Sequence, residues 1–166
     1  MLKWIPLALF SFSLFSSSLL ASPINHLRKV GEGEMQYLFW TLYSAEFYRS
    51  QETGSPSSQA LKITYFKSIS QQALIEATQD QWQHLGYSVS DIRQWSQPLQ
   101  AIWPNVEPGD ELTFISDDTG YGQFYFEDQA IGTVQDPTFS QAFLDIWLSE
   151  RTTEPELRQQ LLGLNR

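Results

Sequence analysis

The chain has 166 residues, a formal net charge of −9 and no cysteine. Disulfide bonds are therefore excluded. An acidic chain whose longest basic run is two residues is also a poor partner for nucleic acid or anionic lipid surfaces, which attract clusters of Lys and Arg. Two isolated histidines leave a zinc site unsupported, so we expect no metal and no other cofactor.

The first residues have the layout of a secretory signal peptide. Lys3 precedes an apolar run over residues 4–15, which is followed by a Ser-rich stretch and by small residues near Ala21. The run is shorter than the ~20 residues that a membrane-spanning helix needs. We therefore expect residues 1–21 to be a signal peptide that is cleaved near Ala21. The mature protein is then expected in a bacterial periplasm, without stable membrane insertion.

The remaining part of the chain is expected to form one domain over residues 24–166. Chains of that size normally build a single core and bury about two thirds of their extended-chain surface. The chain contains no internal repeat that would suggest a further unit.

The segment LFWTLYSAEFY, residues 38–48, carries five aromatic rings and one charged group. Its aromatic content and the preceding Gly31 and Gly33 predict an extended strand over residues 35–48. A strand that is apolar at nearly every position is covered on both faces. We therefore expect helices against one face and a ligand pocket against the other.

A second strand is predicted over residues 60–67, after a loop that contains Gly and Pro. Two helices follow it. Ser70 is placed to cap the first helix and Gly86 to end it. The second begins at Ser90, and Pro98 should bend it, because the proline ring clashes with the carbonyl four residues earlier.

Three short strands are predicted next, over residues 111–116, 122–127 and 130–134, with the turn spacing of an antiparallel meander. An Asp-Pro pair at positions 136–137 predicts the start of a third helix, and a capping box at positions 153–156 predicts the start of the last. The order of strands, helices, strands and helices indicates an α+β fold.

The order and spacing of five segments resemble those of the bacterial branch of the chalcone isomerase-like proteins. The segments are GEGEMQYLFWTLYSAEFY, ALKITYF, WPNVEPGDELTFI, FSQAFLDIWLS and LRQQLLG, and together they cover residues 31–163. The resemblance implies an antiparallel β-sheet with helices packed on one face, an open-faced β-sandwich. It also implies a cleft between sheet and helices for an apolar ligand.

The enzymes of that family close a flavanone ring by attack of a phenolate on an enone. This chemistry needs cationic or hydrogen-bonding donors fixed near the developing negative charge. Met35 stands where the plant enzymes carry an arginine, and the helix after the second strand has no tyrosine between Phe66 and Gly86. Because two charge-handling groups are missing, we expect no isomerase activity and name no catalytic residue.

Another branch of the family holds fatty acids without reacting them, and binds the carboxylate with the same arginine and a strand tyrosine. Tyr43 occupies the position of that tyrosine, but the arginine is absent. A buried carboxylate without a partner is costly, so a fatty acid would need water or another cation, such as Arg28 or Arg49. A neutral lipid-like ligand fits better, and Tyr43, Trp40 and Met35 are the residues expected to bind it.

Three functional hypotheses follow, and the oligomeric state stays open. The favoured one is a non-catalytic carrier or sensor of a small apolar molecule. The second is a periplasmic protein-interaction or structural domain, which predicts a filled core and an exposed apolar patch. The third is an isomerase or another enzyme, which needs a cation inside the cleft.

Overall fold

The computed structural model describes residues 21–51, 57–117 and 119–164, so the expected signal peptide lies outside the described residues except for Ala21. Six strands form one sheet in which neighbours in the chain are neighbours in space, all antiparallel. The strands are β1 (Arg28–Tyr37), β2 (Trp40–Arg49), β3 (Gln59–Tyr65), β4 (Glu111–Ser116), β5 (Gly122–Phe126) and β6 (Gln129–Val134). The helices are α1 (Gln71–Leu85), α2 (Val89–Ile102), α3 (Phe139–Leu148) and α4 (Pro155–Leu161).

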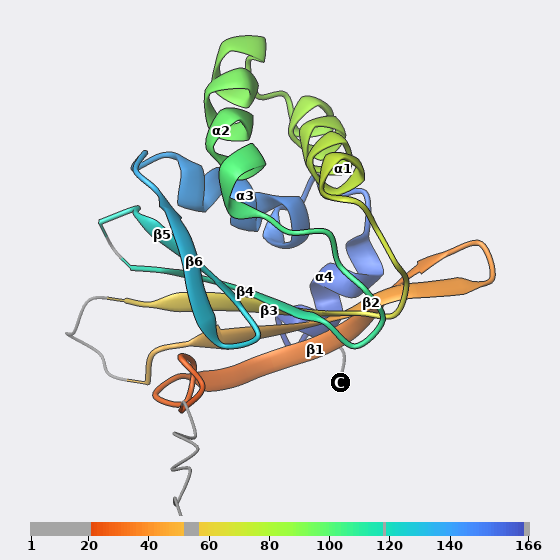
Figure 1. Ribbon diagram of the computed structural model, residues 1–166. Helices are drawn as coiled ribbons and strands as arrows, with labels where there is room; N and C mark the ends of the chain where they lie inside the picture. The colour runs from red at the N-terminus through yellow and green to blue at the C-terminus, as the bar shows by residue number, and fades with distance from the viewer. Residues whose placement is uncertain (1–20, 52–56, 118, 165–166) are drawn as a thin grey trace, which may run out of the picture.

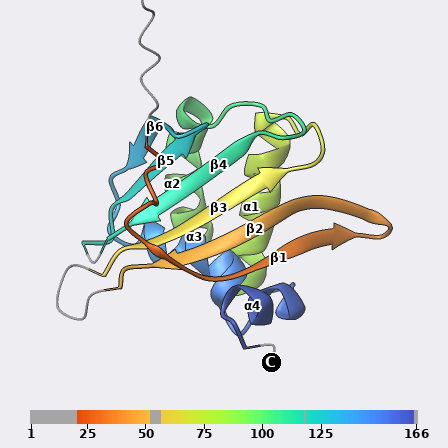
Figure 2. The ribbon, with the colours of Figure 1, turned by 90° about the horizontal axis from the view of Figure 1, so that it is seen from below.

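Helices α1, α2 and α3 lie over one face of the sheet, and α4 lies beside β1 (Figure 1). The view from below shows the opposite face without a covering helix (Figure 2). The expected α+β fold, an antiparallel sheet with helices on one face, is confirmed. Within the described residues no helix is long and apolar enough to cross a membrane.

The single strand predicted over residues 35–48 is wrong, because this region is the β1–β2 hairpin. Its two-residue turn consists of Leu38 and Phe39, and Tyr37 pairs with Trp40. Leu38 has a φ of 55°, a left-handed conformation that costs an ordinary residue about 1 kcal/mol. Glycine, asparagine or aspartate usually marks such a turn. The apolar sequence contains none of these residues, so the turn gives no local signal.

The expectation that this strand is covered on both faces is also wrong. The side chains of Ala45 and Phe47 point toward the helices and are fully buried. Ser44 and Glu46 alternate with them on the other face and stay partly exposed. The sheet is therefore covered by helices on one side only.

The first two helices begin at serine N-caps, close to their predicted starts. Ser70 accepts a hydrogen bond from the Ala73 backbone N–H at the start of α1, and Gly86 ends the helix with a φ of 89°. α2 begins at Val89, one residue before the predicted start at Ser90, because Ser88 is the N-cap. The predicted capping box at 153–156 is replaced by a start at Pro155.

An aromatic cluster joins the sheet to α3. The ring centroid of Phe114 on β4 lies 4.8 Å from those of Phe124 on β5 and Phe143 on α3. Phe139 stacks on Phe143 at 5.7 Å, and all four side chains are buried. Buried aromatic rings contribute large apolar areas and specific edge-to-face contacts. The cluster therefore fixes α3 against the centre of the sheet.

Both outer strands of the sheet are irregular. The β1–β2 pairing contains two register shifts, and the β5–β6 pairing contains one next to Phe124. α4 packs on β1 where Gly31 and Gly33 provide room. On the opposite outer strand, a side chain added at Gly132 would meet Ile102 of α2 at 2.6 Å.

Because α4 packs on β1, substitutions at Gly31 and Gly33 should reduce stability by different amounts. A Cβ atom at Gly31 would lie 2.1 Å from the backbone oxygen of Gln160, whereas one at Gly33 would lie 2.0 Å from the end of the flexible Gln160 side chain. We expect Gly31→Ala to destabilise the protein by about 1–3 kcal/mol, since α4 must shift. Gly33→Ala should cost less. Urea denaturation measures both, and equal effects would contradict the seating of α4 on β1.

Candidate functional site

A cavity of about 190 Å³ lies between the sheet and the helices. Most of its wall is apolar or aromatic. The strands contribute Tyr43 and Tyr65, α1 contributes Leu74, the end of α2 contributes Trp103, and α3 contributes Trp147. An apolar cavity of ~150 Å³ in another protein is large enough to stay dry and bind benzene. This cavity therefore has room for a single small ring or a short chain.

The partly exposed residues of the lining mark the mouth of the cavity. Met35 and Leu42 lie on the two strands of the hairpin, and Ala73 and Ala77 lie on the facing side of α1. Glu154, just before α4, completes this rim. Because both α1 positions carry alanine, small side chains leave space between the helix and the hairpin.

Two of the three predicted ligand-binding residues come together here. Met35 and Tyr43 are paired across β1 and β2, and both line the cavity. The structure places Trp40 outside it, next to the hairpin turn, with 60% of its surface exposed. The Lys67 ammonium lies over the Trp40 ring, 4.3 Å from its centroid. The unpredicted turn is the reason, because it carries Trp40 away from the helices.

Tyr43 links β2 to α3 through a hydrogen bond. The indole N–H of Trp147 donates to the Tyr43 hydroxyl oxygen at 2.9 Å, and the Tyr43 and Tyr65 rings meet edge-on at 6.0 Å. Burial raises the pKa of Tyr43 to about 12, and the nearby Glu154 carboxylate also raises it. Burial raises the pKa of Tyr65 in the same way. Both phenols are therefore neutral hydroxyl groups at physiological pH.

Trp103 is the wall residue that sequence reasoning missed as a ligand contact. It is 5% exposed, and its indole N–H has no hydrogen-bond partner within the described part of the chain. An unpaired buried donor costs about 1–3 kcal/mol. The sequence predicts Trp103 as an apolar position of the second helix, but it gives no sign that the N–H lacks a partner.

The described lining of the cavity carries negative charge but no positive charge. Over the described residues, the cavity wall contains no Lys, Arg or His, and its one acidic side chain is Glu154 at the mouth. Burial raises the pKa of the Glu154 carboxyl, and the nearby Glu156 carboxylate raises it further. The site can therefore supply apolar contacts and neutral donors, but no positive charge.

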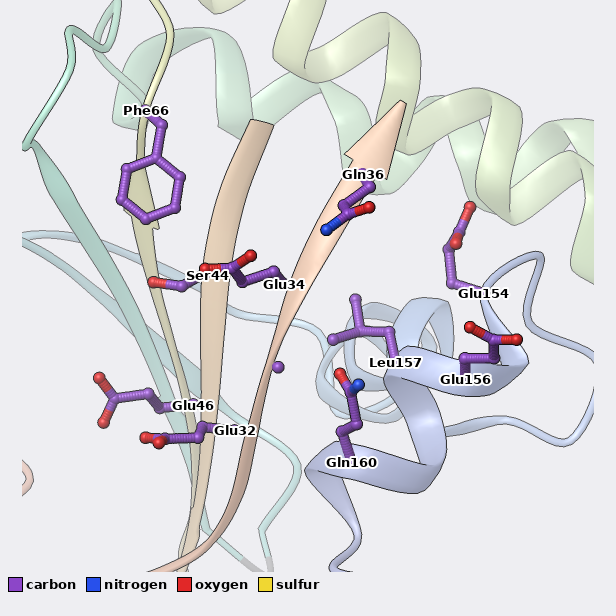
Figure 3. Close-up of a pocket in the computed structure, with 11 residues that line it drawn as sticks. Glu32, Glu34, Gln36, Ser44, Glu46, Phe66, Glu154, Glu156, Leu157 and Gln160 are labelled. Atoms are coloured by element: carbon purple, nitrogen blue, oxygen red, sulfur yellow. The ribbon is translucent and has the colours of Figure 1, made fainter. Parts of the chain in front are cut away.

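A second, larger hollow of about 830 Å³ straddles β1 and is a poor candidate for an apolar ligand. Figure 3 shows Glu32 and Glu46 on one side of β1, and Glu156 and Gln160 of α4 on the other. Most of the side chains that line it are polar or acidic. Among the residues placed by the structure, no group of His, Cys, Asp and Glu side chains could hold a metal ion.

The hydrogen bond between Tyr43 and Trp147 predicts a loss of stability in Tyr43→Phe. The substitution leaves the Trp147 N–H buried without an acceptor, so we expect the free energy of unfolding to fall by about 1–3 kcal/mol. Tyr121→Phe is the matched control, because Tyr121 is 49% exposed. Urea denaturation compares the two variants, and equal stabilities would show that the hydrogen bond contributes nothing.

Alkaline pH provides a second measurement on the same proteins. The unfolded Tyr43 phenol loses its proton near pH 10, whereas the folded one keeps it until about pH 12. The stability that Tyr43 contributes is thus complete below pH 10 and is lost as pH rises toward 12. We expect the wild-type melting temperature to fall over this range more steeply than that of Tyr43→Phe.

Two known proteins are similar to this chain, one in sequence and one in fold. The chain is 27% identical over 146 residues to an uncharacterized protein of Haemophilus influenzae, a match that covers 86% of this chain and 71% of that protein. The crystal structure of a fatty-acid binding protein from Arabidopsis thaliana has a TM-score of 0.65 with this chain at 12% identity. That match covers 87% of this chain and 90% of the plant chain, and it shows a shared fold.

The sequence profile of the chalcone isomerase-like family matches residues 35–163, which is most of the chain and includes nearly the whole sheet and all four helices. This chain therefore belongs to the chalcone isomerase-like family.

Proposed function

We propose that this protein is an exported, non-catalytic carrier or sensor that holds one small neutral apolar molecule between its sheet and its helices. The observation that carries the proposal is the apolar cavity of about 190 Å³, whose described lining contains no cation. The structural likeness to a plant fatty-acid binding protein supports ligand binding as a use of this fold. The protein-interaction hypothesis predicts a filled core and an exposed apolar patch. The cavity between sheet and helices argues against the first, whereas the β1–β2 turn does expose large apolar side chains.

The size of the cavity limits the part of the ligand that can be enclosed. Pockets for drug-sized ligands usually measure about 300–1,000 Å³, and this one is smaller, at about 190 Å³. A long acyl chain would not fit inside without a change of shape, so it would extend through the mouth past Met35 and Leu42. The cavity suits a compact molecule or one end of a longer one.

The charge at the mouth favours a neutral ligand over a fatty acid. The carboxylate of a bound fatty acid would meet Glu154 and find no Lys, Arg or His in the described wall. Burying a charge without a partner is strongly unfavourable. The same shortage of positive charge supports a non-catalytic role, because isomerase chemistry develops negative charge on oxygen and the described wall offers that charge neutral donors but no cation.

Export to the periplasm is part of the proposal and rests on the sequence alone. Residues 1–21 have the charge, the short apolar run and the small residues of a cleavable signal peptide. Transport of apolar molecules through an aqueous compartment is a task that such a cavity would serve.

The unpaired N–H donor of Trp103 in the cavity wall suggests that the ligand contains a hydrogen-bond acceptor. Trp103 lines the cavity and its indole N–H lacks an acceptor among the described residues. The nitrogen is fully buried, so a ligand oxygen would reach it only after neighbouring side chains move, and the hydrogen bond would then remove the cost of the unpaired donor. We therefore expect a neutral molecule with a carbonyl, ester or ether oxygen, rather than a pure hydrocarbon.

Native mass spectrometry tests the proposal on the protein as the cell produces it. We expect a bound neutral mass that is released by organic solvent, because an apolar cavity of this size favours an apolar occupant. The denatured mass should correspond to a chain that begins at or near Ser22. A protein free of small molecules would contradict ligand binding, an extracted carboxylic acid would contradict the charge argument, and an uncleaved chain would contradict export.

A pair of ligands with the same shape tests the role of Trp103. Acetophenone and α-methylstyrene differ in whether an oxygen or a CH₂ group is double-bonded at the same position. We expect the ratio of their affinities to shift by about fivefold toward the hydrocarbon in Trp103→Phe, since one hydrogen bond contributes about 1 kcal/mol. The change in cavity volume affects both ligands alike. An unchanged ratio would show that the indole N–H does not bind the ligand.

A further inference from the structure

The turn of the β1–β2 hairpin exposes four large apolar side chains in succession. Tyr37 is 62% exposed, Leu38 76%, Phe39 98% and Trp40 60%. We call these four residues the aromatic tip. Single exposed apolar residues are common on protein surfaces, but a contiguous exposed group marks a site of interaction.

The hairpin carries the aromatic tip away from the body of the protein. Figures 1 and 2, two perpendicular views, both show β1 and β2 extending beyond the rest of the sheet and beyond the helices. The tip is therefore accessible to a flat surface, and no described segment covers it.

The local backbone does not explain why these residues are present. Leu38 adopts a φ of 55° at the first position of a two-residue turn, where glycine, asparagine or aspartate is usually favoured. Leucine at this position makes the turn less stable than glycine, asparagine or aspartate would make it. Unfavourable conformations that persist in a structure are concentrated at functional positions.

We propose that the aromatic tip inserts into the interfacial region of a zwitterionic lipid bilayer and docks the protein reversibly on a membrane. Tyr and Trp are enriched at this depth, because each has an apolar ring and a polar group. A stable protein–protein interface needs about 20–30 residues on each side. The four residues of the narrow tip fit insertion between lipid head groups better than such an interface.

The charges near the tip specify the type of lipid. The ammonium group of Lys67 lies over the ring of Trp40, where it is available to a lipid phosphate. Behind the tip, β1 carries the exposed carboxylates of Glu32 and Glu34, and the chain has a net charge of −9. A surface with excess negative charge would repel this protein, whereas a zwitterionic one would not.

The tip lies close to the mouth of the cavity. Met35 and Leu42, which line the mouth, are each two residues from the tip along their strands. A bilayer that holds the tip therefore lies near the opening through which an apolar ligand would leave or enter. Docking itself does not require the cavity to hold a ligand, so the two proposals can fail separately.

Vesicle flotation tests the docking. The protein is recovered as the cell produces it, and its N-terminus is determined so that all variants compared begin at the same residue. With phosphatidylcholine vesicles, we expect Leu38→Asn/Phe39→Gly to bind at least tenfold more weakly than the wild type. Its melting temperature should stay close to that of the wild type, since asparagine tolerates the left-handed conformation at position 38 and neither exposed side chain belongs to the core. Val89→Ser removes a 70% exposed side chain at the start of α2 and should bind like the wild type.

A fluorescence measurement locates the contact. Lipids brominated on their acyl chains should quench the emission of Trp40, and this quenching should disappear in Trp40→Phe, which keeps an apolar ring at the tip. Equal binding of the wild type and the double variant would overturn the proposal, as would stronger binding to phosphatidylglycerol vesicles. Failure of the wild type to bind any vesicle, with self-association that the double variant abolishes, would identify the tip as a protein contact instead.

Discussion

The aromatic cluster of Phe114, Phe124 and Phe143 is the constraint from which the rest of the architecture follows. Close packing of these rings holds α3 against β4 and β5. α1 packs on α2 and α3. The cavity lies between α1 and the side chains of β2 and β3. The core is therefore closely packed where α3 meets β4 and β5, and it contains the cavity where α1 faces β2 and β3.

The fold could be predicted from the sequence largely because its signals are local. Ser70 and Gly86 delimit α1 through hydrogen bonds within a few residues, and β4 begins and ends at the residues that the spacing of the turns predicts. The hairpin turn at Leu38 could not be predicted, because the residues that usually mark a turn are absent from it. Because the turn was not predicted, Trp40 was expected at the ligand, whereas it lies beside the turn and is exposed.

The candidate site was accessible from the sequence only through the family resemblance. Met35 and Tyr43 were identified because they occupy positions that matter in related proteins, and both line the cavity. Trp103 and Glu154 come from the end of α2 and the loop before α4, and only tertiary packing brings them to the same wall. The cavity lies between the sheet and the helices of a fold that this chain shares, at 12% identity, with a fatty-acid binding protein. The side chains of the lining, which lack a positive group among the described residues, then decide which molecules are compatible with it.

The irregular outer strands affect how this sheet meets other copies of the chain. An exposed strand with regularly spaced backbone groups is a template onto which a further strand can be added, and growth of this kind leads to fibrous aggregates. β1 is interrupted by two register shifts and lies beside α4, while β6 pairs with β5 through a register shift, and its Gly132 lies against Ile102. Neither margin of the sheet presents a long, flat ladder of free backbone groups, so polymerisation through strand addition is disfavoured at both.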